Sequence, residues 1–387
     1  MAKVRPKESD ILPRGLGPAL TAIRKHFGER PIFAPSGRRY IPTRHRALGL
    51  LLGGASHPGI PTGTVIETVG QAGSGKTSLT MALADAVINQ PEDAEHQVWM
   101  PDSGKVETVP APRRVLVLDF EQTFDIDYMR RAVRNTSLAE VDSKGRVVNA
   151  KTANVFVHTP DTLEEGIEIG IQLIASGELG LIVLDSVAAM LSEDERAARM
   201  GQNTMGLTAR AMGKMFRKTV HLLRRYGTVM AIINQWRDKI GVSFGDPRTT
   251  PGGKAAEFFD SIRLDVTGPH KTPWFNPGKV VRVKAMKNKV TGRKGDQCEY
   301  HLGGGLGLCA ELELVEALER ARLATRRKGI VIKTGKNRIK HFGTVEECVA
   351  WLRDSPDETH RVLWANAARR GQEPQLIQQA SGWEIDQ

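Results

Sequence analysis

The segment Gly70–Thr77 (GQAGSGKT) constrains the fold of this chain more than any other stretch. It fits G-x-x-x-x-G-K-[ST], the pattern of the phosphate-binding loop. The apolar run Val65–Val69 precedes it, and Ser78–Ile88 follows it with apolar residues at helical spacing, so the motif lies between a strand and a helix as it must. Glycines let the N–H groups of such a loop face phosphates at the positive end of the helix. The sequence therefore predicts a site for a nucleoside triphosphate.

Two side chains of the loop have distinct predicted roles. Lys76 can reach the β- and γ-phosphates, and the Thr77 hydroxyl can hold Mg²⁺. The residues of this region that are expected to bind ATP are Gly70, Gln71, Ala72, Gly73, Ser74, Gly75, Lys76, Thr77 and Ser78.

Short apolar runs alternate with helical segments from Leu48 onward. This pattern predicts an α/β fold with a mostly parallel central sheet covered on both faces. The predicted strands are Val65–Val69, Val115–Phe120, Val155–His158, Leu181–Leu184, Val229–Ile233 and Ile262–Val266. Two further stretches, Gln97–Pro110 and Val141–Val148, place turn residues between β-type residues and are predicted to be inserted hairpins.

The two ends of the chain differ from this central pattern. Residues 1–40 are predicted to be a separate arm, in which Ala19–Phe27 is a short amphipathic helix followed by an extended segment. Residues 41–310 form the expected core, and residues 311–387 a small α/β domain. In that domain Arg320–Lys340 holds nine Lys or Arg and no Asp or Glu, a run typical of either a nucleic-acid surface or a solvated face.

The amino-acid composition indicates which binding partners and which cellular compartment to expect. The net charge of +11 favours a polyanionic partner, although solubility alone also explains a basic balance. The three cysteines show no metal-ligand spacing, and their scarcity is typical of a reducing compartment. Because no apolar run approaches about 18 residues and the first ten residues lack an apolar signal core, we expect a cytoplasmic protein without a membrane span.

Polar side chains follow three of the predicted strands. Asp185 ends LIVLD, as expected of an acid that holds the water shell of Mg²⁺. Asp119 and Glu121 both follow VLVL and share one side of the strand by its period of two, so either could position an attacking water. VMAIINQ ends in Asn234 and Gln235, and an amide at this position can sense the γ-phosphate by hydrogen bonding.

A long loop follows Gln235. Trp236–Gly253 contains four glycines and two prolines among basic, apolar and aromatic residues. Long loops in compact domains are usually functional or disordered, and cations combined with apolar wedges suit contact with a single nucleic-acid strand.

These blocks resemble the bacterial RecA recombinases. The similarity is strongest in Met205–Val266, which contains MGLTARAMGKMFRK and INQWRDKIGVSFGDPRTTPGG, and in RVKAMKNK at Arg282–Lys289. It extends to ALTAIRKHFG near the N-terminus and to AWLRDSP at Ala350–Pro356. The resemblance implies a RecA-like P-loop ATPase core with a small N-terminal helix–strand arm for polymerisation and a small α/β C-terminal domain that captures DNA.

The resemblance also implies roles for residues around the nucleotide. Glu121 takes the position of the catalytic glutamate, which decides between the two acids left open above. Gln235 matches the sensor that couples ATP to DNA, and Tyr128 matches the aromatic residue that stacks on adenine. The implied catalytic set is Glu121, Lys76 and Gln235, the metal set is Thr77 and Asp185, and the further nucleotide positions are Asp125, Lys287 and Lys289, the two lysines acting on the neighbouring subunit's ATP.

Two DNA loops are implied at Glu195–Gly206 and Trp236–Thr250. The residues on the DNA side are Met205, Arg210, Gly213, Arg217, Arg237, Lys239, Ile240 and Phe244. Phe258 resembles an aromatic residue that transmits the ATP state across the subunit interface. Several positions depart from the family pattern, namely Arg196 and Arg199 in the first loop, and Trp236, Arg248 and Leu302.

The expected function is that of an ATP-dependent recombinase. Such a protein forms a helical homo-oligomeric filament on single-stranded DNA and exchanges strands with double-stranded DNA. The main alternative is a ring-shaped motor or helicase with the same fold, which the filament-type arm at Ala19–Phe27 disfavours. A small-molecule kinase is disfavoured by the long basic and apolar loop, and a protein with a vestigial site by the complete nucleotide motifs.

Overall fold

The computed structural model describes Thr21 and residues 38–100, 105–144, 146–200, 202, 204, 206–238, 248–271, 279–303, 307–325, 330–333, 339–355 and 357–367. The predicted arm helix Ala19–Phe27, apart from Thr21, lies outside these residues. So do Arg326, Arg327 and Lys328 of the basic run.

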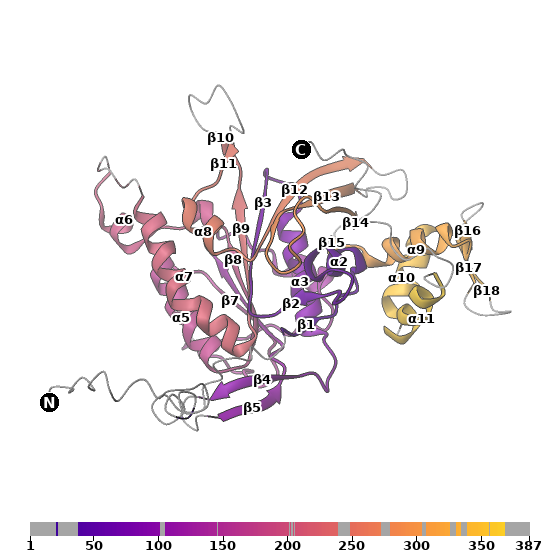
Figure 1. Ribbon diagram of the computed structural model, residues 1–387, viewed down its shortest axis with the longest axis horizontal. Helices are drawn as coiled ribbons and strands as arrows, with labels where there is room; N and C mark the ends of the chain where they lie inside the picture. Colours follow the sequence, from indigo (N-terminus) through magenta and orange to yellow (C-terminus); the bar gives the residue numbers. More distant parts are fainter. Residues whose placement is uncertain are drawn as a thin grey trace.

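A nine-stranded sheet lies at the centre of the described part of the chain (Figure 1), in the order β15-β14-β13-β12-β3-β9-β8-β6-β7. All neighbours from β12 to β7 run parallel, which confirms the mostly parallel sheet. These six strands are β3 (Val65–Gly70), β6 (Arg114–Asp119), β7 (Val155–His158), β8 (Leu179–Asp185), β9 (Val229–Gln235) and β12 (Ile262–Lys271). The antiparallel extension of the sheet, which the apolar runs did not predict, consists of β13 (Lys279–Asn288), β14 (Gln297–Gly303) and β15 (Gly307–Leu308).

Helices cover both faces of this sheet because its strands are apolar on both sides. Ile66 and Val183 point into one buried cluster, whereas their neighbours Val65 and Ile182 point into another. The first face is covered by α2 (Arg46–Gly53), α3 (Lys76–Ile88) and α4 (Ile126–Ala132), and the second by α5 (Leu163–Ala175) and α7 (Leu207–Tyr226).

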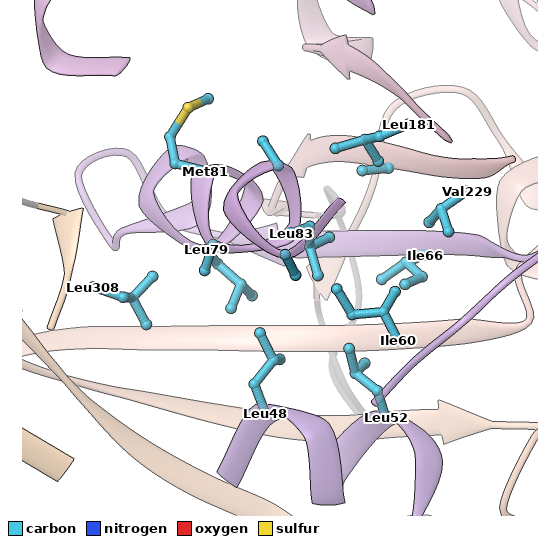
Figure 2. Packing of buried hydrophobic residues seen from close by; sticks show 14 of the residues in the cluster. Leu48, Leu52, Ile60, Ile66, Leu79, Met81, Leu83, Leu181, Val229 and Leu308 are labelled. Carbon is cyan, nitrogen blue, oxygen red and sulfur yellow. The ribbon is translucent and has the colours of Figure 1, made fainter. Parts of the chain in front are cut away.

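Figure 2 shows the first of these clusters, in which Leu48 of α2 and Leu83 of α3 pack with Ile66 of the sheet. All three side chains are almost completely buried. Complete burial of one such side chain contributes about 1.5–3 kcal/mol to folding. The helix that begins at the phosphate loop is therefore anchored along its length.

Smaller elements lie around the sheet. The predicted hairpin at Gln97–Pro110 is confirmed as β4 (Glu95–Met100) paired with β5 (Lys105–Pro110). Among the described residues of the second predicted hairpin, Val141–Val148, Val141 and Val147 form an isolated antiparallel bridge. The remaining short elements are β1 (Tyr40–Ile41), β2 (Ile60–Pro61), the 3₁₀ turn η2 (Val187–Ala189), α6 (Glu193–Ala197), β10 (Arg237–Asp238), β11 (Arg248–Thr249) and α8 (Lys254–Phe259). Among the helices within the described residues, none has the length and apolar character needed to cross a membrane.

The C-terminal elements have a hydrophobic cluster of their own, around Leu314, Ile332 and Leu352. They are α9 (Ala310–Arg320), β16 (Ala324–Thr325), β17 (Ile330–Lys333), β18 (Ile339–Phe342), α10 (Val345–Asp354) and α11 (Asp357–Ala367). Two acids of α9 join them to the core. Glu313 accepts a 2.7 Å hydrogen bond from the N–H of Ala47 at the start of α2, and Glu311 pairs with Arg44 at 3.3 Å.

This junction makes stability depend on pH. Burial raises the pKa of Glu313 to about 8, so ionisation of this carboxyl is disfavoured in the folded state. Its contribution is therefore most favourable below the unfolded pKa of about 4.3 and is lost as pH rises towards 8. Glu313→Gln keeps an oxygen acceptor but cannot ionise. We expect it to raise the free energy of unfolding by about 1–3 kcal/mol at pH 8.5 and to have little effect at pH 5.

Urea unfolding of the parent and the variant at both pH values measures this difference. Glu346→Gln, at an exposed position of α10, is the matched control and should change neither value. An equal pH dependence in the parent and in Glu313→Gln would exclude Glu313 as the source.

Candidate active site

The predicted phosphate loop joins the end of β3 to the start of α3. Gly73 and Gly75 have φ of 70° and 99°, in the left-handed region that glycine adopts without strain. At Gly70, a Cβ would lie 2.5 Å from both the Ser74 Oγ and the Val266 carbonyl oxygen, so only glycine fits there. A Cβ at Gly73 would meet nothing within 4 Å, which shows that this side of the loop is open.

Donors gather inside the loop. The ammonium of the buried Lys76 donates to the carbonyl oxygens of Gly70 at 3.1 Å and Gln71 at 2.7 Å. Burial lowers its pKa, while the charges of Asp185 and Glu121 raise it. The Ser74 hydroxyl is also buried and has no hydrogen-bond partner within the described residues. A cation, an unsatisfied hydroxyl and glycine N–H groups at a helix start fit the oxygens of a phosphate chain.

Asp185 and Thr77 meet beside the loop. Their side chains are hydrogen-bonded, and Asp185 ends β8. Burial raises the pKa of Asp185 to about 7, with further increases from Glu121 and Asp119 and opposing effects of Lys76 and Thr77. A carboxylate and a hydroxyl in contact are oxygen ligands of the kind that Mg²⁺ prefers. The two predicted metal residues are thus placed together.

The structure distinguishes Asp119 from Glu121 by their hydrogen-bond partners, a choice that the strand pattern could not make. Asp119 accepts hydrogen bonds from the backbone N–H groups of Phe124 at 3.0 Å and Thr123 at 3.4 Å, so it supports its own turn. Glu121 instead accepts from the Ser186 hydroxyl and from Gln235 Nε2, the latter at 3.4 Å. Glu121 therefore lies where the ends of β6, β8 and β9 converge, beside the predicted sensor.

Tyr128 lies against the first turn of α3. Its hydroxyl and the Ser78 hydroxyl are 2.5 Å apart, and Asp125 caps α4 by accepting the Tyr128 N–H at 2.8 Å. Near the other side of the loop, Val281 and Leu302 approach within 3.2 and 3.4 Å of the position of a Cβ at Gly75. The phosphate loop is thus flanked by an aromatic side chain and by an aliphatic wall.

Lys287 and Lys289 lie at the carbonyl end of α8. Lys287 Nζ donates to the Glu257 carbonyl oxygen, and Lys289 Nζ donates to that of Phe258 at 3.1 Å. Phe258 is 74% exposed, and Lys289 Nζ is 5.8 Å from the centre of its ring. The two lysines therefore form a cluster with an exposed aromatic residue at the end of α8.

The structure describes some of the residues that are predicted to contact DNA. Arg210 and Arg217 are exposed two turns apart on α7, with the buried Gly213 between them, and Arg237 is exposed on β10. A Cβ at Gly213 would lie 3.5 Å from Arg217 Nη1, so the glycine leaves room for that guanidinium. Met205, Lys239, Ile240 and Phe244 lie outside the described residues.

The α7 surface carries more basic residues than the resemblance assigns. Lys214, His221 and Arg224 are exposed at helical spacing from Arg210 and Arg217, so the five residues share one face. Lys218 at the edge of this face pairs with Glu168 of α5 at 3.7 Å. The spacing of 4, 3, 4 and 3 residues was readable in the sequence and predicts a basic stripe that suits a polyanionic backbone.

Comparison of the sequence with known proteins shows which family it resembles. A model of the RecA N-terminal domain matches residues 138–301. Protein RecA of Salinispora tropica is 32% identical over 360 residues, covering 89% of this chain and 88% of that protein. For Protein RecA of Streptomyces coelicolor the identity is 31% over 362 residues, covering 90% and 83%. For that of Francisella philomiragia it is 32% over 343 residues, covering 85% and 84%. The similarity therefore runs along most of the chain.

Proposed function

The chain belongs to the RecA family, and from this premise we propose that it is a DNA-dependent ATPase that forms a helical filament on single-stranded DNA and exchanges strands with homologous duplex DNA. The observation that carries the proposal is the meeting of Glu121 and Gln235 beside the phosphate loop, because Gln235 is also the last residue before the predicted DNA loop. One side chain thus touches the candidate catalytic acid and adjoins the candidate DNA contact.

The proposed chemistry follows from the residues present. Lys76 would exchange its two loop carbonyls for β- and γ-phosphate oxygens, and Ser74 would gain the partner that it lacks. Bound Mg²⁺ would supply positive charge to the phosphates, held by Thr77 and Asp185. Glu121 would orient the attacking water, and the Ser186 and Gln235 donors would fix its carboxylate.

The filament proposal rests on the surface cluster at α8. The ammonium groups of Lys287 and Lys289 lie against the last carbonyl oxygens of α8, and Phe258 is a large apolar side chain exposed beside them. A neighbouring subunit that covers this cluster would bring the two cations to its own ATP. The contact is then heterologous, and repetition of a heterologous contact that does not close gives a helix.

Duplex capture is proposed for the C-terminal elements. Arg320, Arg322, Lys333 and Lys340 are the described basic members of a run without acidic residues that follows the core. We infer that they attract the second DNA partner electrostatically. A ring-shaped motor remains the alternative, and the shape of the oligomer distinguishes the two.

The proposal is tested by ATP hydrolysis with and without single-stranded DNA. Hydrolysis should be slow alone and strongly stimulated by single strands, and much less by duplex. Equal rates in the presence and absence of DNA would contradict the proposed function.

DNA binding should be electrostatic and independent of base sequence. We expect Arg217→Ala and Arg237→Ala each to weaken single-strand affinity roughly three- to tenfold for every sequence, and to lower the slope of log K against log salt by about 0.7. Fluorescence anisotropy at several salt concentrations measures both quantities. Arg293→Ala, which removes an exposed cation paired with Asp296 in the turn between β13 and β14, is the matched control. A loss confined to one DNA sequence would refute backbone contact.

A further inference from the structure

The two ends of the second DNA loop meet at one carboxylate. Trp236, the first residue of the loop, donates from Nε1 to Asp265 Oδ1 at 2.8 Å. Arg248, the first described residue at the other end, places Nη1 3.4 Å from Asp265 Oδ2. The short strands β10 and β11 pair between them, with Asp238 opposite Arg248. The loop therefore leaves and rejoins the core at Asp265 of β12.

Two guanidinium groups lie close to the indole ring of Trp236. The Arg248 Cζ is 4.5 Å from the centre of its ring, and the Arg263 Cζ is 5.6 Å from it. A guanidinium group within about 6 Å of the centre of an aromatic ring is attracted to the face of that ring. The hydrogen bond to Asp265 fixes the ring, so the three contacts support one another. We call Trp236, Arg248 and Asp265 the loop clasp.

A buried network joins the clasp to the sheet beneath it. Arg263, whose side chain is 7% exposed, pairs with the fully buried Glu67 at 2.8 Å and donates to Thr250 Oγ1 at 3.0 Å. Glu67 in turn accepts from Asn234 at 2.8 Å. Removal of one partner from such a network leaves a buried charge uncompensated, so it resists rearrangement.

Gln235 lies between the clasp and this network. Its backbone N–H donates to Asn234 Oδ1 at 2.9 Å, the next residue is Trp236, and its side chain reaches Glu121. Because the residues on either side of it are fixed, a movement of the loop ends must also move Gln235. Conversely, a shift of Gln235 towards a γ-phosphate must move the loop ends.

We propose that the loop clasp is a positioning device that makes the conformation of the DNA loop and the place of Gln235 mutually dependent, so that bound nucleotide and bound single-stranded DNA strengthen each other. The inference rests on the proposed function and deepens it. The three residues touch neither ATP nor the reacting atoms, and they act through Gln235.

The experiment measures coupling rather than activity alone. The coupling factor is the fold increase in single-strand affinity caused by a slowly hydrolysed ATP analogue. Thermodynamic linkage requires the same factor for the effect of DNA on analogue binding. Asp265→Asn keeps an oxygen acceptor for Trp236 but removes the charge that faces Arg248. Trp236→Phe keeps an aromatic ring but removes the N–H.

We expect each variant to lower the coupling factor about tenfold, with analogue affinity in the absence of DNA changed less than twofold in Asp265→Asn. Arg248→Lys should lower it less, because it retains the charge and loses only the planar group. Arg282→Gln, which breaks the 2.9 Å surface pair with Glu299 on the neighbouring strands, is the control and should leave the factor intact.

A coupling factor equal to the parent's in Asp265→Asn and Trp236→Phe overturns the inference. So does a parallel fall of both separate affinities with the factor preserved, since that is the signature of a purely structural role. If the parent itself shows no coupling and no DNA-stimulated hydrolysis, the proposed function fails first. The two failures are therefore distinguishable.

Discussion

Glu121→Gln should lower DNA-stimulated ATP hydrolysis by about 10²–10⁴-fold while ATP binding persists. The change removes the carboxylate that would orient water but leaves the phosphate loop and the cation site complete. It also removes a like charge that raises the pKa of Asp185, so the affinity for Mg²⁺ and ATP should not fall. Steady-state hydrolysis and equilibrium binding of a fluorescent ATP analogue separate the two effects.

Two further variants sharpen this test. Lys76→Ala should lose binding as well as hydrolysis, because the triphosphate loses its main cation. Asp119→Asn should affect chiefly the turn at Thr123 and Phe124, which Asp119 supports through two backbone N–H groups. Hydrolysis at the parent rate by Glu121→Gln, together with a catalytic defect in a stably folded Asp119→Asn, would reverse the assignment of the two acids.

The double change of Lys287 and Lys289 to alanine should give a folded protein with DNA-stimulated hydrolysis reduced at least about 100-fold, because every ATP would lack the cations supplied from the next subunit. The fold should tolerate the change, since both ammonium groups lie against carbonyl oxygens at a helix end, and the main cost is loss of the favourable charge effect of Lys287 on the buried Asp260. Hydrolysis with single-stranded DNA and the thermal unfolding midpoint measure the two properties.

Mixing two inactive variants tests the shared site directly. In a 1:1 mixture of the double lysine variant with Lys76→Ala, about a quarter of the interfaces would combine an intact phosphate loop with intact neighbouring lysines. We therefore expect the mixture to regain roughly that share of the parent's activity. A mixture as inactive as its components would show that the lysines serve their own chain or none.

Much of the core was predictable because each central strand is buried on both faces. Runs such as LIVL before Asp185 and VMAII before Asn234 have no polar residue to interrupt them, so period and length alone identify β8 and β9. The antiparallel strands were missed for the opposite reason. In β13 the buried Val281, Val283 and Ala285 alternate with charged residues, which makes no continuous apolar run.

The candidate site was predictable in its parts but not in its contacts. The phosphate loop has a fixed spacing, so Lys76 and Thr77 follow from the letters alone. The choice between Asp119 and Glu121 depends on which backbone N–H groups lie nearby, and a period of two places both acids on the same side. The loop clasp could not be predicted from the sequence, because its residues are separated along the chain and the folding of the sheet brings them together.

Electron microscopy of the protein with single-stranded DNA and a slowly hydrolysed ATP analogue tests the proposed filament most directly. We predict regular helical filaments that require both DNA and nucleotide, and that disappear when Lys287 and Lys289 are replaced by alanine. Closed rings, or dispersed monomers that nevertheless hydrolyse ATP at the full DNA-stimulated rate, would contradict a filament whose ATP lies between subunits.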